Sequence, residues 1–197
     1  MMESAAPQRT RMRPDARREL IRRQGARLFG RDGYAATRLD DIAAAAGITK
    51  PMIYRHFDSK KALYLEVLRR HEADLPGFIE AAQRPGSNPE ETVARVLDGW
   101  LDYVAENSDA WLVIFRDRTG DREIESARRQ VSGRATKVMS DFLRESSPGL
   151  DPGLIEPTAD FLRSGLAGLV LWWIDHPATP RQTVHATATR ACTAVLG

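Results

Sequence analysis

Hydrophobic residues recur every three or four positions through most of the chain, which is the spacing of amphipathic α-helices. The first clear case is a short stretch between Thr37 and Gly47, where one helical face carries Leu39, Ile42, Ala43 and Ala46. No run of alternating β-branched residues is long enough to indicate a sheet. The pattern therefore predicts an all-α protein of about nine helices.

Two short helices are predicted to follow each other closely in this stretch. Thr37 and Asp40 match a capping box, which favours a helix start at Thr37. Gly47 ends the helix, because glycine tolerates the left-handed backbone of a tight turn. The next helix begins at about Thr49, and Pro51 is acceptable in its first turn. Together they form a helix-turn-helix.

The second helix of this pair carries side chains suited to nucleic acid. Ile53 and Phe57 are expected to be buried, and five donors and apolar or flat groups are left outward: Thr49, Lys50, Met52, Tyr54 and His56. Such groups suit phosphates and base edges. Ser59 is predicted to cap the following helix, whose Lys60 and backbone N–H groups form a phosphate clamp.

This segment resembles the DNA-binding domain of the TetR family of bacterial transcription regulators. The resemblance covers about Ala16 to Leu68, and its motifs are Arg27-Leu28-Phe29 to Gly33-Tyr34, Thr37, Ile42-Ala43 to Gly47-Ile48, Tyr54-Arg55-His56-Phe57 and Ser59-Lys60. It implies phosphate contacts from Thr37, Tyr54, His56 and Lys60, and groove contacts from Thr49, Lys50 and Met52. Arg38 and Pro51 complete the expected DNA-contact set.

Two positions depart from the family pattern. Pro51 and Met52 stand where the family more often has a small residue and a hydroxyl residue, which favours an apolar contact such as one with a thymine methyl. For Tyr54 and His56 the alternative is a purely structural role at a half-buried surface. Their shared outward position on the recognition helix favours DNA contact.

The distribution of charge supports a DNA-binding head. The net charge is only +2, but residues 1–70 carry 16 Lys and Arg against 8 Asp and Glu, and residues 71–197 carry 13 against 19. This split is typical of a nucleic-acid-binding head on a body kept away from DNA. A merely solvated basic face on the first helix would explain four of these charges equally well: Arg17, Arg18, Arg22 and Arg23.

Composition and charge suggest three segments. Residues 1–13 form a flexible basic arm, residues 14–58 the helix-turn-helix domain and residues 59–197 a helical regulatory and dimerisation domain. The single Cys192 excludes a disulfide within the chain, and the lack of an apolar leader indicates the cytoplasm. The longest apolar run, Leu166 to Ile174, is too short to span a bilayer, so no membrane partner is expected.

Helix-start signals divide the remaining chain. Asn88-Pro89, Asp151-Pro152 and Thr179-Pro180, the last with Gln182 as a capping box, each open a predicted helix. A long helix between Ile124 and Phe142 ends near Ser147, and a short segment, Ala110 to Phe115, precedes it. We expect a lever helix from Ser59 to Leu75 that ends or hinges at Pro76-Gly77.

The last two helices carry two apolar stripes and small residues, which let helices approach closely. The resemblance implies that they pair with a second subunit as a four-helix bundle, and packing within one subunit is the alternative. A two-fold dimer would also read two half-sites. The expected interface residues are Leu162, Gly165, Leu166, Gly168, Leu169, Trp173, Val184, Ala188, Ala191 and Val195.

Aromatic residues are scarce at 7%, and most of them fall between the head and these helices. Such a stripe is more often core than pocket, but the resemblance implies an inducer site within the helical body. The expected ligand contacts are Trp100, Tyr103, Trp111, Phe115, Arg116, Phe142, Phe161 and Trp172. The composition favours a largely apolar or aromatic effector.

Other function classes find little support. The four histidines are scattered without metal-ligand spacing, and there is neither a nucleophile elbow nor a phosphate-binding glycine loop, so we expect no enzyme, catalytic residue, metal or cofactor. A helical architectural protein that coats DNA would not need so large a body. The sequence therefore favours a DNA-binding repressor that a small apolar ligand releases from double-stranded operator DNA.

Overall fold

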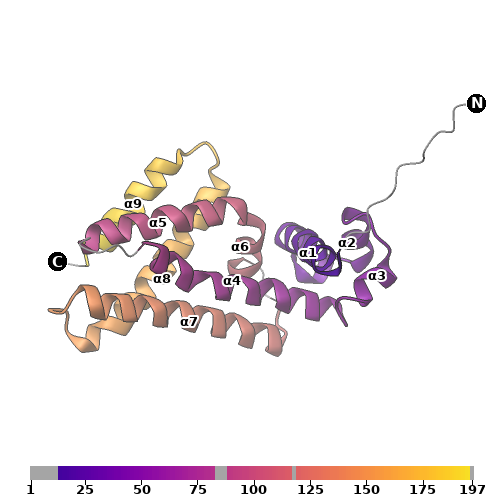
Figure 1. Ribbon diagram of the computed structural model, residues 1–197, viewed down its shortest axis with the longest axis horizontal. Coiled ribbons are helices and arrows are strands. Elements are labelled where there is room, and N and C mark those ends of the chain that lie inside the picture. The colour runs from indigo at the N-terminus through magenta and orange to yellow at the C-terminus, as the bar shows by residue number, and fades with distance from the viewer. Residues whose placement is uncertain (1–12, 83–87, 117–118, 196–197) are drawn as a thin grey trace, which may run out of the picture.

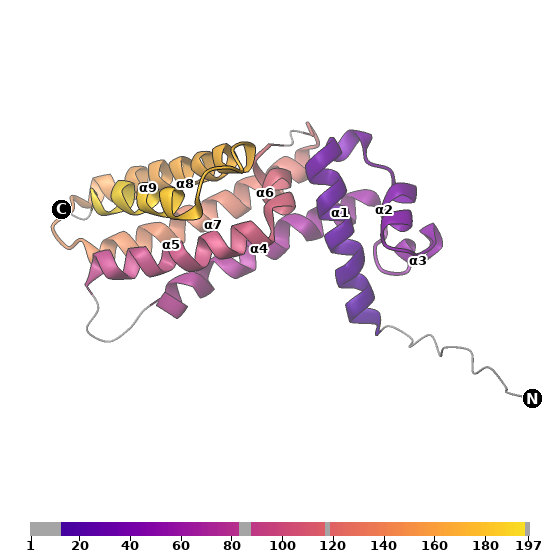
Figure 2. The same ribbon diagram turned by 90° about the horizontal axis from the view of Figure 1, so that it is seen from above.

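The computed structural model describes residues 13–82, 88–116 and 119–195, and these ranges form nine α-helices without strands. Figures 1 and 2 show a small head joined to a larger body by one long helix. The head consists of α1 (Pro14–Ala36), α2 (Leu39–Ala45) and α3 (Lys50–Tyr54), and α4 (Lys60–Ala82) is the connecting helix. The all-α class and the helix-turn-helix head are confirmed; the proposed arm lies outside the described residues except for Arg13.

The body is a bundle of the five remaining helices. They are α5 (Pro89–Glu106), α6 (Ser108–Phe115), α7 (Arg122–Ser146), α8 (Pro152–Asp175) and α9 (Arg181–Thr193). In Figure 2 α8 and α9 run side by side along one edge of the body. The short α6 lies at the end of the bundle nearest the head, beside α1 (Figures 1 and 2).

Local start and stop signals explain most helix boundaries. Gly47 has φ of +64°, the left-handed conformation predicted for the turn between α2 and α3. The side chains of Ser59, Asn88 and Asp151 accept backbone N–H groups at the starts of α4, α5 and α8, as predicted.

Three predicted boundaries are wrong. The N-cap of α2 is Arg38 rather than Thr37, and α9 has Pro180 at its N-cap without a side-chain cap, so the capping box of Thr179 is not formed. The lever helix α4 continues to Ala82 and therefore does not end at Pro76-Gly77. The capping and helix-breaking residues are present at these three places in the sequence. Packing against neighbouring helices, rather than these residues, decides where the three helices begin or end.

The core of the head extends into the body. Buried side chains of α1 to α4, including Phe29, Ile42 and Tyr64, form one cluster with Val113 and Ile114 of α6. A second cluster joins α5, α7, α8 and α9 in the body. Because α6 belongs to the head's core, movement of α6 changes what the head packs against.

Gly30 of α1 brings the head closest to α6. A Cβ atom at this position would lie 2.4 Å from the backbone oxygen of Asp109, much closer than any non-bonded contact allows. Glycine is therefore required where α1 meets the start of α6. Within the described part of the chain, no helix is long and apolar enough to cross a membrane.

Candidate functional site

The recognition helix α3 presents an accessible surface at the end of the molecule. Thr49 and Pro51 are exposed, the Tyr54 side chain is 50% exposed, and Ile53 and Phe57 are buried beneath it. The predicted burial of Ile53 and Phe57 is thus confirmed. The half-buried Met52 contacts the guanidinium of Arg17 on α1, with Nη1 and Sδ 3.9 Å apart.

Lys50 is placed at the start of α3 but is not free in this structure. Its ammonium lies 3.0 Å from a carboxylate oxygen of Asp40 on α2, and both side chains are about half exposed. An exposed pair of this kind contributes little to stability. A phosphate or a base edge can therefore replace Asp40 as the partner of Lys50 at small cost.

Two predicted phosphate contacts instead hold the head together. Thr37 is only 2% exposed, and its hydroxyl donates to the backbone oxygens of Gly33 and Leu28. The ammonium of Lys60 donates to the backbone oxygens of Tyr34 and Thr37, at 2.8 and 2.9 Å. The prediction that the Thr37 hydroxyl faces phosphate is wrong, because it is used to close the end of α1.

Arginines of α1 lie beside the recognition helix, where the sequence alone allowed a merely solvated face. Arg18 donates to the backbone oxygen of His56, and its guanidinium lies 4.3 Å from the centre of the Phe57 ring. Burial lowers the pKa of His56, and Arg17, Arg18 and Arg55 lower it further. The His56 ring is therefore neutral at neutral pH, and the positive charge at this surface comes from arginine and lysine. Arg38 is exposed at the N-cap of α2.

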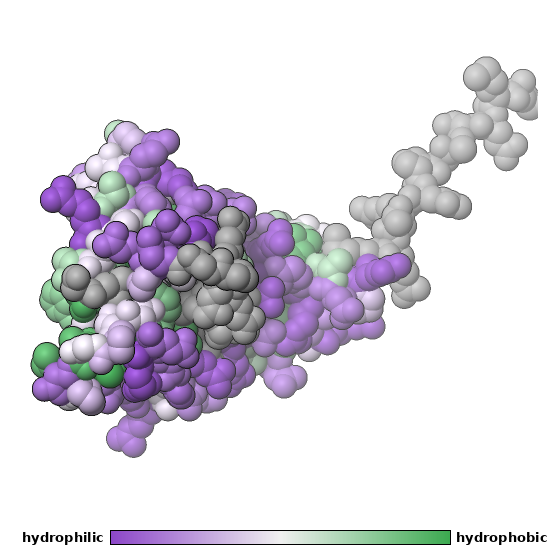
Figure 3. Space-filling view, turned by 60° about the vertical axis from the view of Figure 1, so that its left-hand side comes forward, coloured by the Kyte–Doolittle hydropathy of each residue, from purple (hydrophilic) through white to green (hydrophobic). Residues whose placement is uncertain are grey.

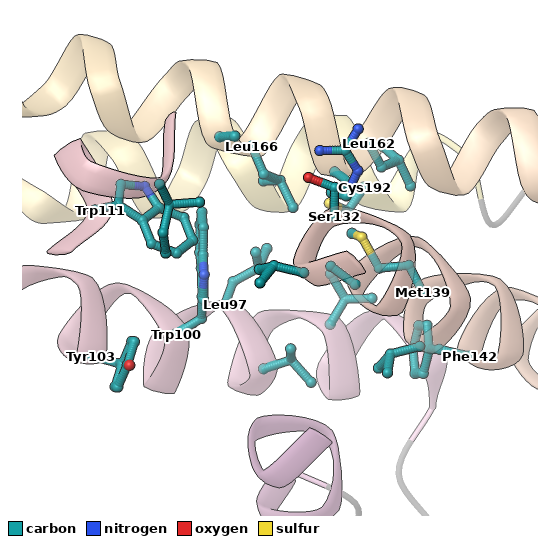
Figure 4. A pocket seen from close by; sticks show the side chains of 18 of the residues that line it. Leu97, Trp100, Tyr103, Trp111, Ser132, Met139, Phe142, Leu162, Leu166 and Cys192 are labelled. Carbon is teal, nitrogen blue, oxygen red and sulfur yellow. The ribbon is translucent and has the colours of Figure 1, made fainter. Parts of the chain in front are cut away.

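A cavity of about 150 Å³ lies inside the body, between α5, α6, α7 and α8. Figure 4 shows Trp100 and Trp111 at one end of this cavity and Met139 with Phe142 at the other. The two tryptophan rings meet edge to face, with centroids 5.8 Å apart, and Phe115 packs on Trp111. Aliphatic side chains such as Leu97 and Leu166 line the space between these ends.

The cavity includes five of the eight residues predicted to contact a ligand: Trp100, Tyr103, Trp111, Phe115 and Phe142. The other three do not line it. Phe161 is 74% exposed, and Trp172 is 45% exposed and stacks on His176. Arg116 forms an ion pair with Asp175, at 2.5 Å. These three predictions are wrong for this cavity, because α8 turns Phe161 and Trp172 away from it and Arg116 reaches across the surface.

Few polar groups line the cavity. The sequence interpretation missed Ser132 of α7 and Arg163 of α8, although Ser132 shares a helical face with Ala135, Met139 and Phe142, which could have indicated it. Cys192 also lines the wall, and burial raises the pKa of its thiol to about 11. The thiol is therefore protonated at neutral pH and behaves as a small apolar group.

Several residues predicted for the dimer interface are buried within the subunit. Leu162 is buried in the body's own core, as are Val184 and Ala188 of α9, so these three are not available to a second subunit. Leu166, Leu169, Trp173 and Val195 are half-buried and pack against the same core. The interface prediction is wrong for these inward residues.

Three of the predicted interface residues are exposed, namely Gly165 and Gly168 of α8 and Ala191 of α9. An apolar stripe on α8 faces outward, made up of the two glycines and the exposed Leu154, Phe161 and Trp172. Figure 3, which shows one face of the molecule, has hydrophobic patches among hydrophilic residues on the body. Added Cβ atoms at Gly165 and Gly168 would meet nothing within 4 Å. This stripe is apolar surface that nothing in the described chain covers.

A buried polar group connects the cavity wall to the lever helix. Arg128 of α7 is 7% exposed and donates to the backbone oxygen of Ile114 and to the hydroxyl of Tyr64 on α4. Ile114 also lines the cavity. The same guanidinium thus bonds α6 and α4, and a shift of α6 disturbs its contact with α4.

No cluster of three or more histidine, cysteine, aspartate or glutamate side chains that could hold a metal is found among the described residues. The geometry is thus that of an accessible helix-turn-helix joined, through α4 and α6, to an apolar cavity. These are two binding surfaces, one on the head and one inside the body. The same pair of features is found in known proteins of one family.

Family models match both parts of the chain. A model described as bacterial regulatory proteins of the tetR family matches residues 21–67, and one described as a tetracyclin repressor-like C-terminal domain matches residues 89–195. The second match alone covers more than half of the chain.

Individual relatives are transcriptional regulators. The HTH-type transcriptional activator FasR of Mycolicibacterium smegmatis is 26% identical over 180 residues, which cover 88% of this chain and 80% of FasR. The HTH-type transcriptional repressor KstR2 of Rhodococcus jostii is 44% identical over 92 residues, covering 47% of this chain and 45% of KstR2.

Solved structures show the same fold. A TetR-like transcriptional regulator from Rhodococcus sp. RHA1 superposes with a TM-score of 0.75 at 22% identity, covering 92% of this chain and 96% of its own. The regulator FadR from Bacillus subtilis in complex with stearoyl-CoA superposes with a TM-score of 0.73 at 15% identity, covering 91% and 97%. With both family models matched in order, the chain belongs to the TetR family of bacterial transcriptional regulators.

Proposed function

We propose that this protein is a homodimeric, sequence-specific DNA-binding regulator that leaves its operator when a small, largely apolar ligand fills the cavity. The observation that carries this proposal is the position of α6. Trp111, Ile114 and Phe115 of this helix line the cavity, and the backbone of Asp109 at its start touches Gly30 of the head. One short helix therefore contacts both functional parts.

The head supports the DNA-binding part of the proposal. The helix α3 is exposed at the end of the molecule, and the major groove of DNA is wide enough to admit an α-helix. There Lys50 and the apolar Pro51 and Met52 can contact base edges. The exposed Tyr54 and the arginines of α1 suit the phosphates on either side. We give Lys60 and Thr37 a structural role. The Lys60 ammonium, at the start of α4, bonds to backbone oxygens at the end of α1, including that of Thr37, and so holds the DNA-binding surface in place.

The outward stripe of α8 supports the homodimer. Phe161 and Trp172 are large apolar side chains left in contact with solvent, and the glycines between them allow a second helix to approach closely. A two-fold dimer buries the same stripe from both copies. It also presents two α3 helices to two half-sites of duplex DNA.

Coupling through α6 supports release by the ligand. The cavity, at about 150 Å³, is smaller than the roughly 300–1,000 Å³ of sites for drug-sized ligands, so such a ligand has to displace lining side chains. Displacement of Ile114 moves the backbone oxygen that Arg128 holds, and Arg128 also holds Tyr64 of α4. The ligand therefore shifts α4 and the spacing of the two heads.

The direction of regulation is part of the proposal. FasR is named as an activator and KstR2 as a repressor, so the family name alone fits either outcome. We propose repression that the ligand relieves. Because the proposed partner is genomic DNA, we propose the bacterial cytoplasm as its location.

DNA fragments selected from a random pool provide the first test. At about 150 mM salt, the dimer should bind the selected site at least ~10³-fold more tightly than a shuffled sequence of the same length. Tyr54→Ala should weaken binding to both sequences by a similar factor, because phosphate contacts do not depend on sequence. Equal affinity of the wild-type protein for the two DNAs would indicate an architectural protein instead.

A further inference from the structure

The unpartnered polar atoms of the cavity wall are hydrogen-bond donors. The Nε and Nη2 atoms of Arg163 bond to three side chains outside the cavity, those of Thr136, Asp160 and Ser164, at 2.7 to 3.1 Å. Its remaining amine, Nη1, has no partner among the described residues. The arginine side chain is 18% exposed.

Ser132 of α7 lines the cavity together with Arg163. Its hydroxyl makes no hydrogen bond to any other residue that the structure describes, and Figure 4 shows it on the side of the cavity where Leu162 and Cys192 lie. The indole Nε1 of Trp111, another lining residue, is buried without an acceptor. A bound ligand with an acceptor atom gives these donors a partner, and the gain is largest for a fully buried donor such as the Trp111 indole.

The charge around Arg163 decides between a neutral and an anionic acceptor. Asp160 already balances the guanidinium, with Nη2 and Oδ1 2.7 Å apart. The Arg163 and Thr136 hydrogen bonds lower the pKa of Asp160, so this carboxyl remains ionised at neutral pH. A ligand carboxylate at Nη1 would place a second negative charge near the half-exposed Asp160 and would bring its own charge against the apolar lining of the cavity, which is unfavourable. A carbonyl oxygen accepts the same hydrogen bonds without that charge.

From these contacts we infer that the effector is an apolar molecule with one neutral acceptor group, such as a ketone, ester or amide carbonyl, bound at Arg163 Nη1 and Ser132 Oγ. This inference rests on the proposed function, since it assigns the ligand class of the same cavity. The hydrocarbon part lies between the two tryptophans and Met139, whose unbranched side chain adapts to different shapes.

Three small probes of similar shape test the ligand class by calorimetric titration of the full-length protein. Benzylacetone carries a neutral carbonyl, butylbenzene has no polar group and phenylbutanoate carries a carboxylate. We expect benzylacetone to bind about tenfold more tightly than butylbenzene, because it gains hydrogen bonds to otherwise unpaired donors. Phenylbutanoate should bind more weakly than benzylacetone.

Two variants tie this preference to the named atoms. Ser132→Ala and Arg163→Met should each remove most of the tenfold preference for benzylacetone while the affinity for butylbenzene stays the same. Ser126→Ala, on the same helix but not in the cavity wall, should retain the preference.

Each alternative outcome contradicts a separate part of the account. Equal affinity for benzylacetone and butylbenzene, unchanged in both variants, would overturn the inference and leave the apolar cavity as proposed. Tighter binding of phenylbutanoate would overturn the neutral class. Failure of all three probes to bind would count against the proposed ligand function itself.

Discussion

Gly30→Ala is expected to destabilise the protein by about 1–3 kcal/mol, the usual cost of overpacking a close contact. The new methyl group would lie 2.4 Å from the backbone oxygen of Asp109, so α1 and α6 must move apart. Backbone atoms form this contact, and a change of side-chain rotamer cannot relieve it. Thermal unfolding of the variant, monitored by circular dichroism, measures the loss.

A matched substitution separates this effect from the general effect of alanine in a helix. Gly133 lies within α7, and a Cβ atom there would meet nothing within 4 Å. Gly133→Ala should therefore stabilise the protein by about 0.5–1 kcal/mol, because glycine is unfavourable inside a helix. If Gly30→Ala proved as stable as Gly133→Ala, α6 would not be in firm contact with the head, and the proposed route of coupling would be lost.

Phe161→Asp is expected to convert the dimer to monomers at concentrations where the wild-type protein is dimeric. Truncating a central apolar contact typically costs about 2 kcal/mol or more, and a two-fold interface contains the residue twice, so the dissociation constant should rise about 10³-fold. Sedimentation velocity at several protein concentrations measures this shift. Operator affinity should fall with it, because a monomer reads only one half-site.

The folded subunit should tolerate this change. Phe161 is 74% exposed in the single chain, so its replacement removes little packing within the subunit. Gln130→Asp on the exposed surface of α7 introduces the same charge away from the stripe and should leave the dimer intact. A wild-type sedimentation profile for Phe161→Asp would show that α8 does not form the interface.

Some helix boundaries could be predicted because they depend on local chemistry, although the predicted caps at Thr37 and Thr179 do not form. Asn88 and Asp151 each cap the N–H groups of the next turn, and Gly47 adopts the conformation that a tight turn requires. The same holds for the buried Ile53 and Phe57, since a helix of known register has a fixed inner face. The helical class and the helix-turn-helix of the head therefore follow from capping residues and from the spacing of apolar residues a few positions apart.

The orientation of the α8 stripes could not be predicted in this way. Leu162 and Phe161 are adjacent in sequence and both apolar, and only the packing of α8 against the other helices of the body decides that Leu162 is buried and Phe161 exposed. The role of Thr37 was likewise hidden. Its hydroxyl bonds to Leu28, nine residues earlier, a contact that depends on how α1 ends.

Arg163 shows the same limit for the candidate site. An arginine in an apolar stretch reads as a solvated charge, yet Asp160 and Thr136 hold it against the cavity. The aromatic residues Trp100 and Trp111 were easier to place, because their large apolar surfaces favour the interior of the body. The hydrogen-bonding atoms of the site required the three-dimensional structure.

The most direct test of ligand-controlled DNA binding is the affinity of the dimer for its selected operator, measured by fluorescence anisotropy at fixed salt with and without a saturating ligand. The ligand is a compound that raises the unfolding temperature of the wild-type protein, with benzylacetone as the first choice. We expect a loss of operator affinity of about 5- to 150-fold, corresponding to a coupling free energy of about 1–3 kcal/mol. Unchanged operator affinity at saturation of the cavity would contradict it.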